Sequence, residues 1–179
     1  MGWQAGALMM ERDAVISPDE RYRYLLRRRW MPGPTFGFIM LNPSTADAQR
    51  DDPTIRRCIG FAGSHGCGSL LVVNLFALRT THPGALLAKG ETPVGPENDV
   101  AIIEALAECP IVVAAWGSFP YLHSKLSHRP EQVIRMALDH DHSLAALGKT
   151  IGGYPRHPLY LRSDQDLDVW QARPVRRRA

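Results

Sequence analysis

Four uninterrupted apolar runs most constrain what this chain of 179 residues can fold into. Each run is continuous rather than alternating, which is typical of parallel strands that are covered on both faces. A polar residue or a glycine follows each run, directly or, after Trp116, one position later. The runs span residues 38–41, 69–73, 110–115 and 144–147. They predict a mainly parallel, four-stranded core sheet.

Helical patterns separate these runs. Asp52-Pro53-Thr54 is typical of a helix start and leads an apolar face that extends to about residue 65. A second helix is predicted to start at Asn98 or Glu97 and to run through Ala107. A short helical segment is predicted at residues 83–89, and one helix or two short ones between residues 121 and 138. Strands that alternate with helices predict an α/β protein, a three-layer α/β/α sandwich.

The first 33 residues are predicted to form an amino-terminal β-hairpin extension, with a turn at residues 16–20. Five arginines between residues 21 and 29 alternate with Tyr22 and Tyr24 in a pattern typical of nucleic-acid surfaces. The arginines near the carboxyl end are expected to form a flexible basic tail over residues 172–179. The length and the apolar fraction of 45% predict a single domain over residues 1–179.

Several classes of protein are disfavoured by what the sequence lacks. The three cysteines have no paired spacing, so we expect neither disulfides nor a zinc site, and a cytoplasmic location. No apolar run reaches the roughly 18 residues of a membrane span. No glycine-rich dinucleotide motif follows a strand. The histidines at 123, 128, 140 and 142 show no supporting ligand pattern, so we predict no metal and no cofactor.

The predicted strands end in residues that can act on a ligand. The four runs are followed by Asn42, Asn74, Trp116-Gly117 and the approach to His157. In a parallel sheet these ends meet at one edge, where a pocket is expected. An asparagine can position a water or read a base edge, and a histidine can donate to a developing negative charge. Structural roles stay open: a strand-end cap for Asn74, a surface loop for His157 and the core for Trp116.

Three of these motifs, taken in order, resemble the uracil-DNA glycosylase superfamily. Residues 41–44 (Leu-Asn-Pro-Ser) are similar to its water-activating motif, residues 72–79 to the segment that pairs with the extruded base, and residues 157–161 (His-Pro-Leu-Tyr-Leu) to its last motif. The resemblance implies an extruded nucleotide in the pocket. It also implies a fold of the glycosylase type that hydrolyses an N-glycosidic bond without a metal.

The resemblance also implies roles for individual residues. Asn42 or Asp47 would align the water, and His157 would stabilise charge on the leaving base. Asn74 would read the base, Ser44 would leave room for a substituted pyrimidine or a purine, and an inward Phe61 or Phe76 would stack on it. The basic residues expected to contact phosphate are Arg56, Arg79 and Arg156.

Over most of its length the chain is also similar to a bacterial family known only as domain-of-unknown-function family 1643. The shared motifs are Met40-Leu-Asn-Pro-Ser-Thr-Ala-Asp, Asp52-Pro-Thr, Val73-Asn-Leu-Phe, Pro93-Val-Gly and Pro155-Arg-His-Pro-Leu-Tyr. This resemblance implies no activity. Three functions therefore stay open: a glycosylase-like enzyme on nucleic acid, DNA foremost; a non-catalytic module that binds modified bases; and a hydrolase of small nucleosides or nucleotides. The sequence does not determine the oligomeric state.

Overall fold

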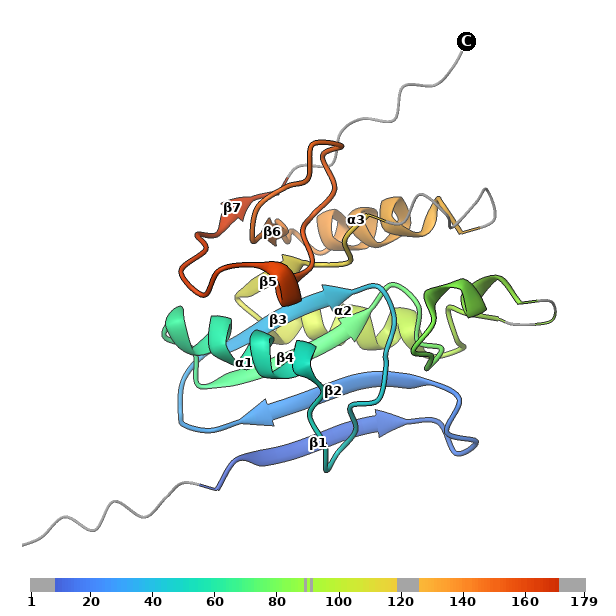
Figure 1. Ribbon diagram of the computed structural model, residues 1–179, viewed down its shortest axis with the longest axis horizontal. Coiled ribbons are helices and arrows are strands. Elements are labelled where there is room, and N and C mark those ends of the chain that lie inside the picture. The colour runs from blue at the N-terminus through green and yellow to red at the C-terminus, as the bar shows by residue number, and fades with distance from the viewer. Residues whose placement is uncertain (1–8, 89, 91, 119–125, 171–179) are drawn as a thin grey trace, which may run out of the picture.

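The computed structural model describes residues 9–88, 90, 92–118 and 126–170. Seven strands form one mixed sheet in the order β1-β2-β4-β3-β5-β6-β7 (Figure 1). The strands are β1 (Glu11–Ile16), β2 (Arg23–Arg29), β3 (Thr35–Met40), β4 (Ser69–Asn74), β5 (Ile111–Ala114), β6 (Ala145–Ala146) and β7 (Asp168–Val169).

The four predicted core strands are confirmed as the parallel part of this sheet, in the order β4-β3-β5-β6. The first of them begins at Thr35, three positions before the predicted start at Phe38, and the last is only two residues long. β1 and β2 form the predicted antiparallel hairpin at one edge. At the other edge β7, which was not predicted, pairs antiparallel with β6.

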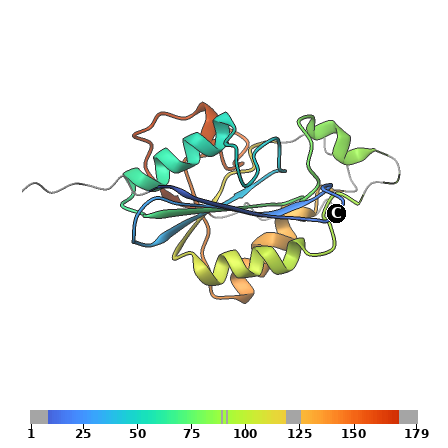
Figure 2. The ribbon, with the colours of Figure 1, turned by 90° about the horizontal axis from the view of Figure 1, so that it is seen from below.

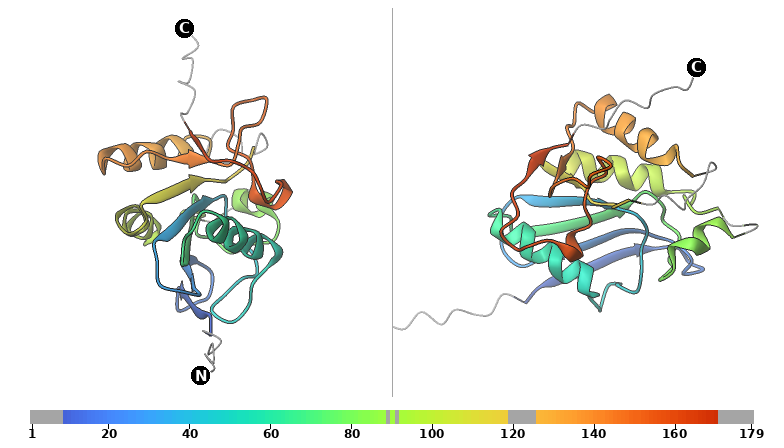
Figure 3. Two further views of the ribbon diagram at one scale, coloured as in Figure 1. Left: turned by 90° about the vertical axis from the view of Figure 1, so that its left-hand side faces the viewer. Right: turned by 45° about the horizontal axis from the view of Figure 1, so that its top comes forward.

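Helices cover both faces of the sheet (Figures 2 and 3). α1 lies on one face, and α2 and α3 lie on the other. Each face has its own buried apolar cluster, because continuous apolar strands need partners on both sides. The helices are α1 (Pro53–Ser64), α2 (Asn98–Glu108) and α3 (Arg129–Asp139), with short 3-10 helices η1 (Pro83–Leu87) and η2 (Pro158–Tyr160).

The hairpin is an integral part of the sheet rather than an extension. β2 pairs with β4 as well as with β1, so it is an inner strand. Arg23 and Arg28 on β2 are only 2% and 0% exposed, and Tyr22 and Tyr24 are buried. Arg27 forms an ion pair with Glu108 at the end of α2. The predicted nucleic-acid surface of alternating arginines and tyrosines is therefore wrong, because most of these side chains point into the protein.

The buried arginines of β2 hold the loop between β3 and α1. Arg23 donates to the carbonyl oxygen of Ala46 at 2.8 Å. Arg28 pairs with the carboxylate of Asp51 at 2.7 Å, and its guanidinium also donates to the carbonyl oxygens of Asp47 and Arg50. Because buried charges need such partners, the formation of β2 and the formation of this loop depend on each other.

Some sequence predictions lie outside the described residues. These are the basic tail at 172–179, His123 and the chain between 119 and 125. The three cysteines, Cys58, Cys67 and Cys109, are free and buried. Within the described ranges, no helix has the length and apolar character needed to cross a bilayer.

Candidate functional site

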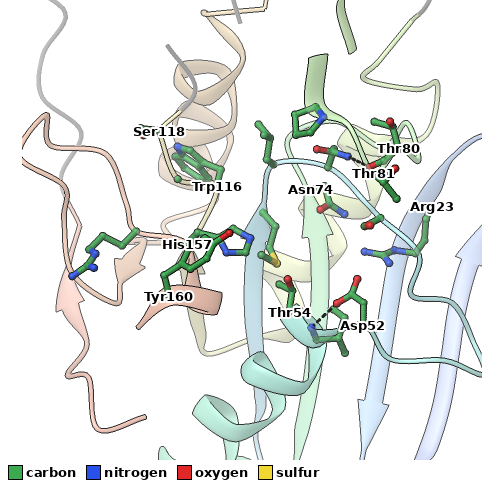
Figure 4. A pocket seen from close by; sticks show the side chains of 18 of the residues that line it. Arg23, Asp52, Thr54, Asn74, Thr80, Thr81, Trp116, Ser118, His157 and Tyr160 are labelled. Atoms are coloured by element: carbon green, nitrogen blue, oxygen red, sulfur yellow. Dashed lines mark hydrogen bonds between the residues drawn. The ribbon is translucent and has the colours of Figure 1, made fainter. Parts of the chain in front are cut away.

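A pocket of about 540 Å³ opens at the carboxyl edge of the parallel strands, on the face that α1 covers (Figure 4). We call it the strand-end pocket. Asn42, Asn74 and His157 all line it, as the convergence of strand ends predicted. The other lining residues used below are Arg23, Ser44, Asp52, Thr54, Thr80, Thr81, Trp116, Ser118, Arg156 and Tyr160.

The register of the sheet brings the strand ends together. Met40 at the end of β3 lies opposite Asn74 at the end of β4. Beyond β5, Ala115 donates its backbone N–H to the carbonyl oxygen of Ile39 at 2.9 Å, so Trp116 follows at the same edge. Gly117 has a φ of 73°, in the left-handed region, which lets the chain turn directly after Trp116.

Asn74 presents its side-chain amide to the pocket from a buried position. The residue is 1% exposed, and within the described chain neither Nδ2 nor Oδ1 has a hydrogen-bond partner. A buried polar group left without a partner costs about 1–3 kcal/mol. The amide is therefore held ready for a ligand that supplies one donor and one acceptor.

Two buried side chains hold the backbone around Asn74. Asn98 at the start of α2 donates from Nδ2 to the carbonyl oxygens of Asn74 and Leu75 at 3.0 and 3.1 Å. Arg129 at the start of α3 donates to the Leu75 oxygen at 2.8 Å. Neither supporting role was predicted from the sequence, because each residue begins a helix as many polar residues do, and the oxygens that it holds lie far along the chain.

The His157 ring faces the pocket from the start of η2 (Figure 4). Its Nδ1 accepts a hydrogen bond from the backbone N–H of Leu159 at 3.3 Å, which leaves the proton on Nε2. Burial lowers the pKa of His157 below its ordinary value of 6.5, while Asp52 acts in the opposite direction. The ring is thus a neutral donor at neutral pH. Arg57 on α1 supports this turn by donating to the carbonyl oxygen of Leu161.

Asn42 ties the end of β3 to a neighbouring loop. Its Nδ2 donates to the carbonyl oxygens of Pro43 and Thr80 at 3.0 and 2.8 Å. These bonds use both amide hydrogens, so only Oδ1 can act on a ligand, as an acceptor. Such an oxygen can orient a water molecule.

Arg23 and Asp52 are the charged lining residues that sequence analysis did not place in the site. β2 runs antiparallel to β4, so its amino end lies beside the carboxyl end of β4 and carries Arg23 to the pocket. Asp52 caps α1, with Oδ1 accepting from the backbone N–H of Ile55 at 2.9 Å. An arginine within the apolar stretch 22–26 was the one sequence signal of a buried charge.

The sequence of residues 23–159 matches a family described as proteins of unknown function, DUF1643. The chain belongs to this family. No curated protein matches the chain, and no solved structure matches it. The matched region begins at the first residue of β2 and includes Asn42, Asn74 and His157. Of the pocket-lining residues named above, all but Tyr160 lie in the matched region.

Several predicted site residues lie outside the strand-end pocket. Asp47 instead closes a turn, with its carboxylate accepting from the backbone N–H groups of Gln49 and Arg50, and these bonds lower its pKa. Phe76 is fully buried in the apolar cluster beneath α2 and α3, because the chain leaves the sheet after Asn74. Arg56 donates to the backbone carbonyl oxygen of Asp51, and Arg79 donates to the backbone carbonyl oxygen of Glu20. Ser44 and Arg156 do line the pocket.

Trp116 and Tyr160 supply the aromatic lining that Phe61 and Phe76 were expected to provide. Trp116 is buried, as predicted for a core residue, and packs edge-on against Trp170 at a centroid distance of 5.1 Å. Tyr160 is 79% exposed, with its ring 5.9 Å from that of His157. Both residues lie within motifs that the sequence had marked, Trp116-Gly117 and residues 157–161.

No group of three or more potential metal ligands gathers anywhere in the described part of the chain. His140 and His142 use ring nitrogens on backbone oxygens, Met136 for the first and Cys109 for the second. The side chains that can act on a ligand in the strand-end pocket are therefore two amides, a neutral imidazole, a carboxylate, two guanidiniums and several hydroxyls.

Proposed function

We propose that the strand-end pocket binds a nucleobase and that the protein hydrolyses its N-glycosidic bond. The observation that carries this proposal is the buried amide of Asn74, whose donor and acceptor both lack partners among the described residues. An asparagine amide matches the adjacent donor and acceptor on a base edge. The volume of about 540 Å³ falls in the range of pockets that enclose small ligands.

The remaining lining residues suit the same ligand. Trp116 and Tyr160 offer aromatic surface for a planar base, and Ser44 is small enough to admit a substituted one. The neutral ring of His157 donates from Nε2 to an oxygen or nitrogen of the base as negative charge develops there. These assignments keep the motif order of the uracil-DNA glycosylase superfamily, with which we propose a common arrangement of fold and site.

For hydrolysis, we assign the water to Asp52 and Asn42 rather than to Asp47. The water oxygen attacks the sugar carbon and gives its proton to the Asp52 carboxylate. The bond to the base nitrogen breaks, and its electron pair leaves with the base. Oδ1 of Asn42 accepts from the same water and orients it. This chemistry uses only side chains that line the pocket.

A small nucleoside or nucleotide is the substrate that the surface favours over a duplex. Arg23 and Arg28 are buried, and Arg27 and Arg12 form ion pairs with Glu108 and Asp51. Arg12, Arg27 and Arg28 are consequently occupied by partners within the protein, and Arg23 faces the strand-end pocket rather than the outer surface. Because affinity for nucleic acid comes mainly from basic groups that contact phosphates, these four arginines give little support for a polymer as the ligand.

The test is to incubate the full chain with nucleosides, nucleoside monophosphates and oligonucleotides that carry altered bases, and to measure released base by chromatography. We expect release by the wild type and a loss of about a hundred-fold or more in Asp52→Asn, the scale of a lost catalytic base. Asn74→Leu should abolish binding of the same compounds. Asp47→Asn is the matched control, since Asp47 lies on the same loop outside the pocket, and it should retain activity.

The outcomes separate the alternatives. Binding that requires Asn74, without release of base from any compound, would make the protein a non-catalytic base-binding module. Binding that is unaffected in Asn74→Leu would contradict base recognition by this pocket. An equal loss of base release in Asp47→Asn and Asp52→Asn would contradict the choice of Asp52 over Asp47 as the residue that activates the water.

A further inference from the structure

Arg23 is a buried cation that faces the strand-end pocket without an anionic partner. The residue is 2% exposed, and its Nη1 donates to the Ala46 oxygen at 2.8 Å. Its Nε has no hydrogen-bond partner in the described chain. The ion pairs formed by the described residues do not include Arg23. Burial lowers its pKa to about 10.

An unpaired buried charge is costly, and proteins keep one where a ligand completes it. Arg28 gives the comparison within the same strand. It is equally buried, but it pairs with Asp51 and also donates to four backbone oxygens. β2 therefore carries one arginine that the fold satisfies and one that it leaves open to the pocket.

The groups around Arg23 suit an oxyanion. In Figure 4, Arg23 and Asp52 lie on one side of the pocket, across from His157 and Tyr160, with Thr54 and Asn74 between the two sides. α1, twelve residues long, begins at this place, and the amino end of a helix attracts negative charge. Hydroxyl donors on the pocket wall come from Ser44, Thr54, Thr80 and Thr81.

We infer that the strand-end pocket has a second, anion-binding half in which Arg23 and the surrounding hydroxyls hold the phosphate of a free mononucleotide while Asn74 holds its base. This inference rests on the proposed function for the base half only. A free phosphate monoester fits the burial of Arg23 better than a phosphodiester, because a polymer must continue through the pocket wall in both directions. The substrate class is thus a nucleoside monophosphate.

Asp52 modifies this subsite. It is near enough to Arg23 to raise the pKa of the guanidinium, although the two form no ion pair. Its carboxylate repels a bound phosphate and so limits product affinity. Asp52→Asn should therefore tighten binding of a monophosphate even as it removes hydrolysis.

The experiment compares nucleosides with their 5′-monophosphates by titration calorimetry, and includes inorganic phosphate and short single-stranded oligonucleotides. In the wild type we expect each monophosphate that binds to do so about ten-fold or more tightly than its nucleoside, the scale of one charge-assisted contact. Arg23→Met should remove most of that ratio, and Arg23→Lys should keep part of it. Inorganic phosphate should raise the melting temperature of the wild type but not that of Arg23→Met.

Each contrary result points to one proposal. Equal affinity for nucleosides and monophosphates in the wild type would overturn the anion subsite and leave base recognition standing. Phosphate binding that persists in Asn74→Leu, together with unchanged monophosphate affinity, would support the anion subsite and overturn the base half. Tighter binding of oligonucleotides than of monophosphates would overturn the mononucleotide as the ligand. If Arg23→Met fails to fold, the Arg23→Lys ratio and phosphate protection of the wild type decide.

Discussion

At the scale of single residues, the site depends on which polar atoms already have hydrogen-bond partners within the fold. Asn42 donates both amide hydrogens to backbone oxygens, whereas neither side-chain polar atom of Asn74 has a partner in the described chain. In His157, Nδ1 accepts a hydrogen bond from the Leu159 N–H, and Nε2 remains for a ligand. Three residues that look equivalent as strand-end motifs therefore have an acceptor, a full amide and a donor to offer.

The pH dependence of His157 follows from its burial. Its folded-state pKa is lowered below 6.5, so the unfolded chain binds a proton more readily than the folded chain. The stability contributed by the neutral ring is present above pH 6.5 and is lost as the pH falls through the window between 6.5 and the folded value. A proton on Nδ1 would also break the bond from the Leu159 N–H.

We therefore expect the free energy of unfolding in urea to fall between about pH 7.5 and pH 5.5, and the base affinity to fall with it. In His157→Gln, whose amide can keep a donor near Nε2, the part of this fall that is due to the ring should vanish. The same pH dependence in the variant and the wild type would assign it to other groups.

At the scale of elements, β2 organises the site through the loop that it holds. Arg28 holds the loop between β3 and α1 through its ion pair with Asp51 and its hydrogen bond to the Arg50 oxygen. Arg23 donates to the Ala46 oxygen in the same loop. The loop delivers Ser44 and Asp52 to the pocket. A strand that the sequence suggested as a surface for a partner is instead the support of the candidate site.

Arg28→Ala should destabilise the protein by about 3–5 kcal/mol, because it removes the fully buried partner of the Asp51 carboxylate, which is itself only 9% exposed. Arg12→Ala is the matched control, since Arg12 pairs with the same carboxylate at the surface, 2.6 Å away. That change should cost no more than about 1 kcal/mol. Urea unfolding measures both. Similar losses in the two variants would mean that burial of the pair does not matter.

At the scale of the whole molecule, the domain is one sheet that begins at the hairpin. β2 is covered on both edges, and the match to the family starts at its first residue. Without β2, the edge of β4 and the loop that Arg28 holds would lose their partners. β1 contributes mainly half-buried or exposed side chains.

A chain that starts at Met31 should therefore fail to fold, whereas one that starts at Ser17, and so lacks only β1, should fold with reduced stability. Near-ultraviolet circular dichroism and the dispersion of proton resonances measure this difference. If the chain that starts at Met31 folds, the hairpin of β1 and β2 is not required for the fold.

The sequence by itself determined the parallel core and the convergence of Asn42, Asn74 and His157. Both depend on local signals, namely continuous apolar runs and the polar residues that end them, and on the rule that parallel strands end at one edge. The starts of α1 and α2 were also predicted, because Asp52-Pro53 and Asn98 are local helix signals.

Only the tertiary structure decided which charged and aromatic residues join that edge. Arg23 enters the pocket because β2 pairs antiparallel with β4, and Phe76 leaves it because the chain turns into the opposite apolar cluster after Asn74. Asp52 replaces Asp47 because the loop between them is held by Arg28. These outcomes depend on pairings between distant segments, which no local pattern specifies. Of the residues that line the pocket, it is the unpaired cation of Arg23 that most narrows the class of ligand.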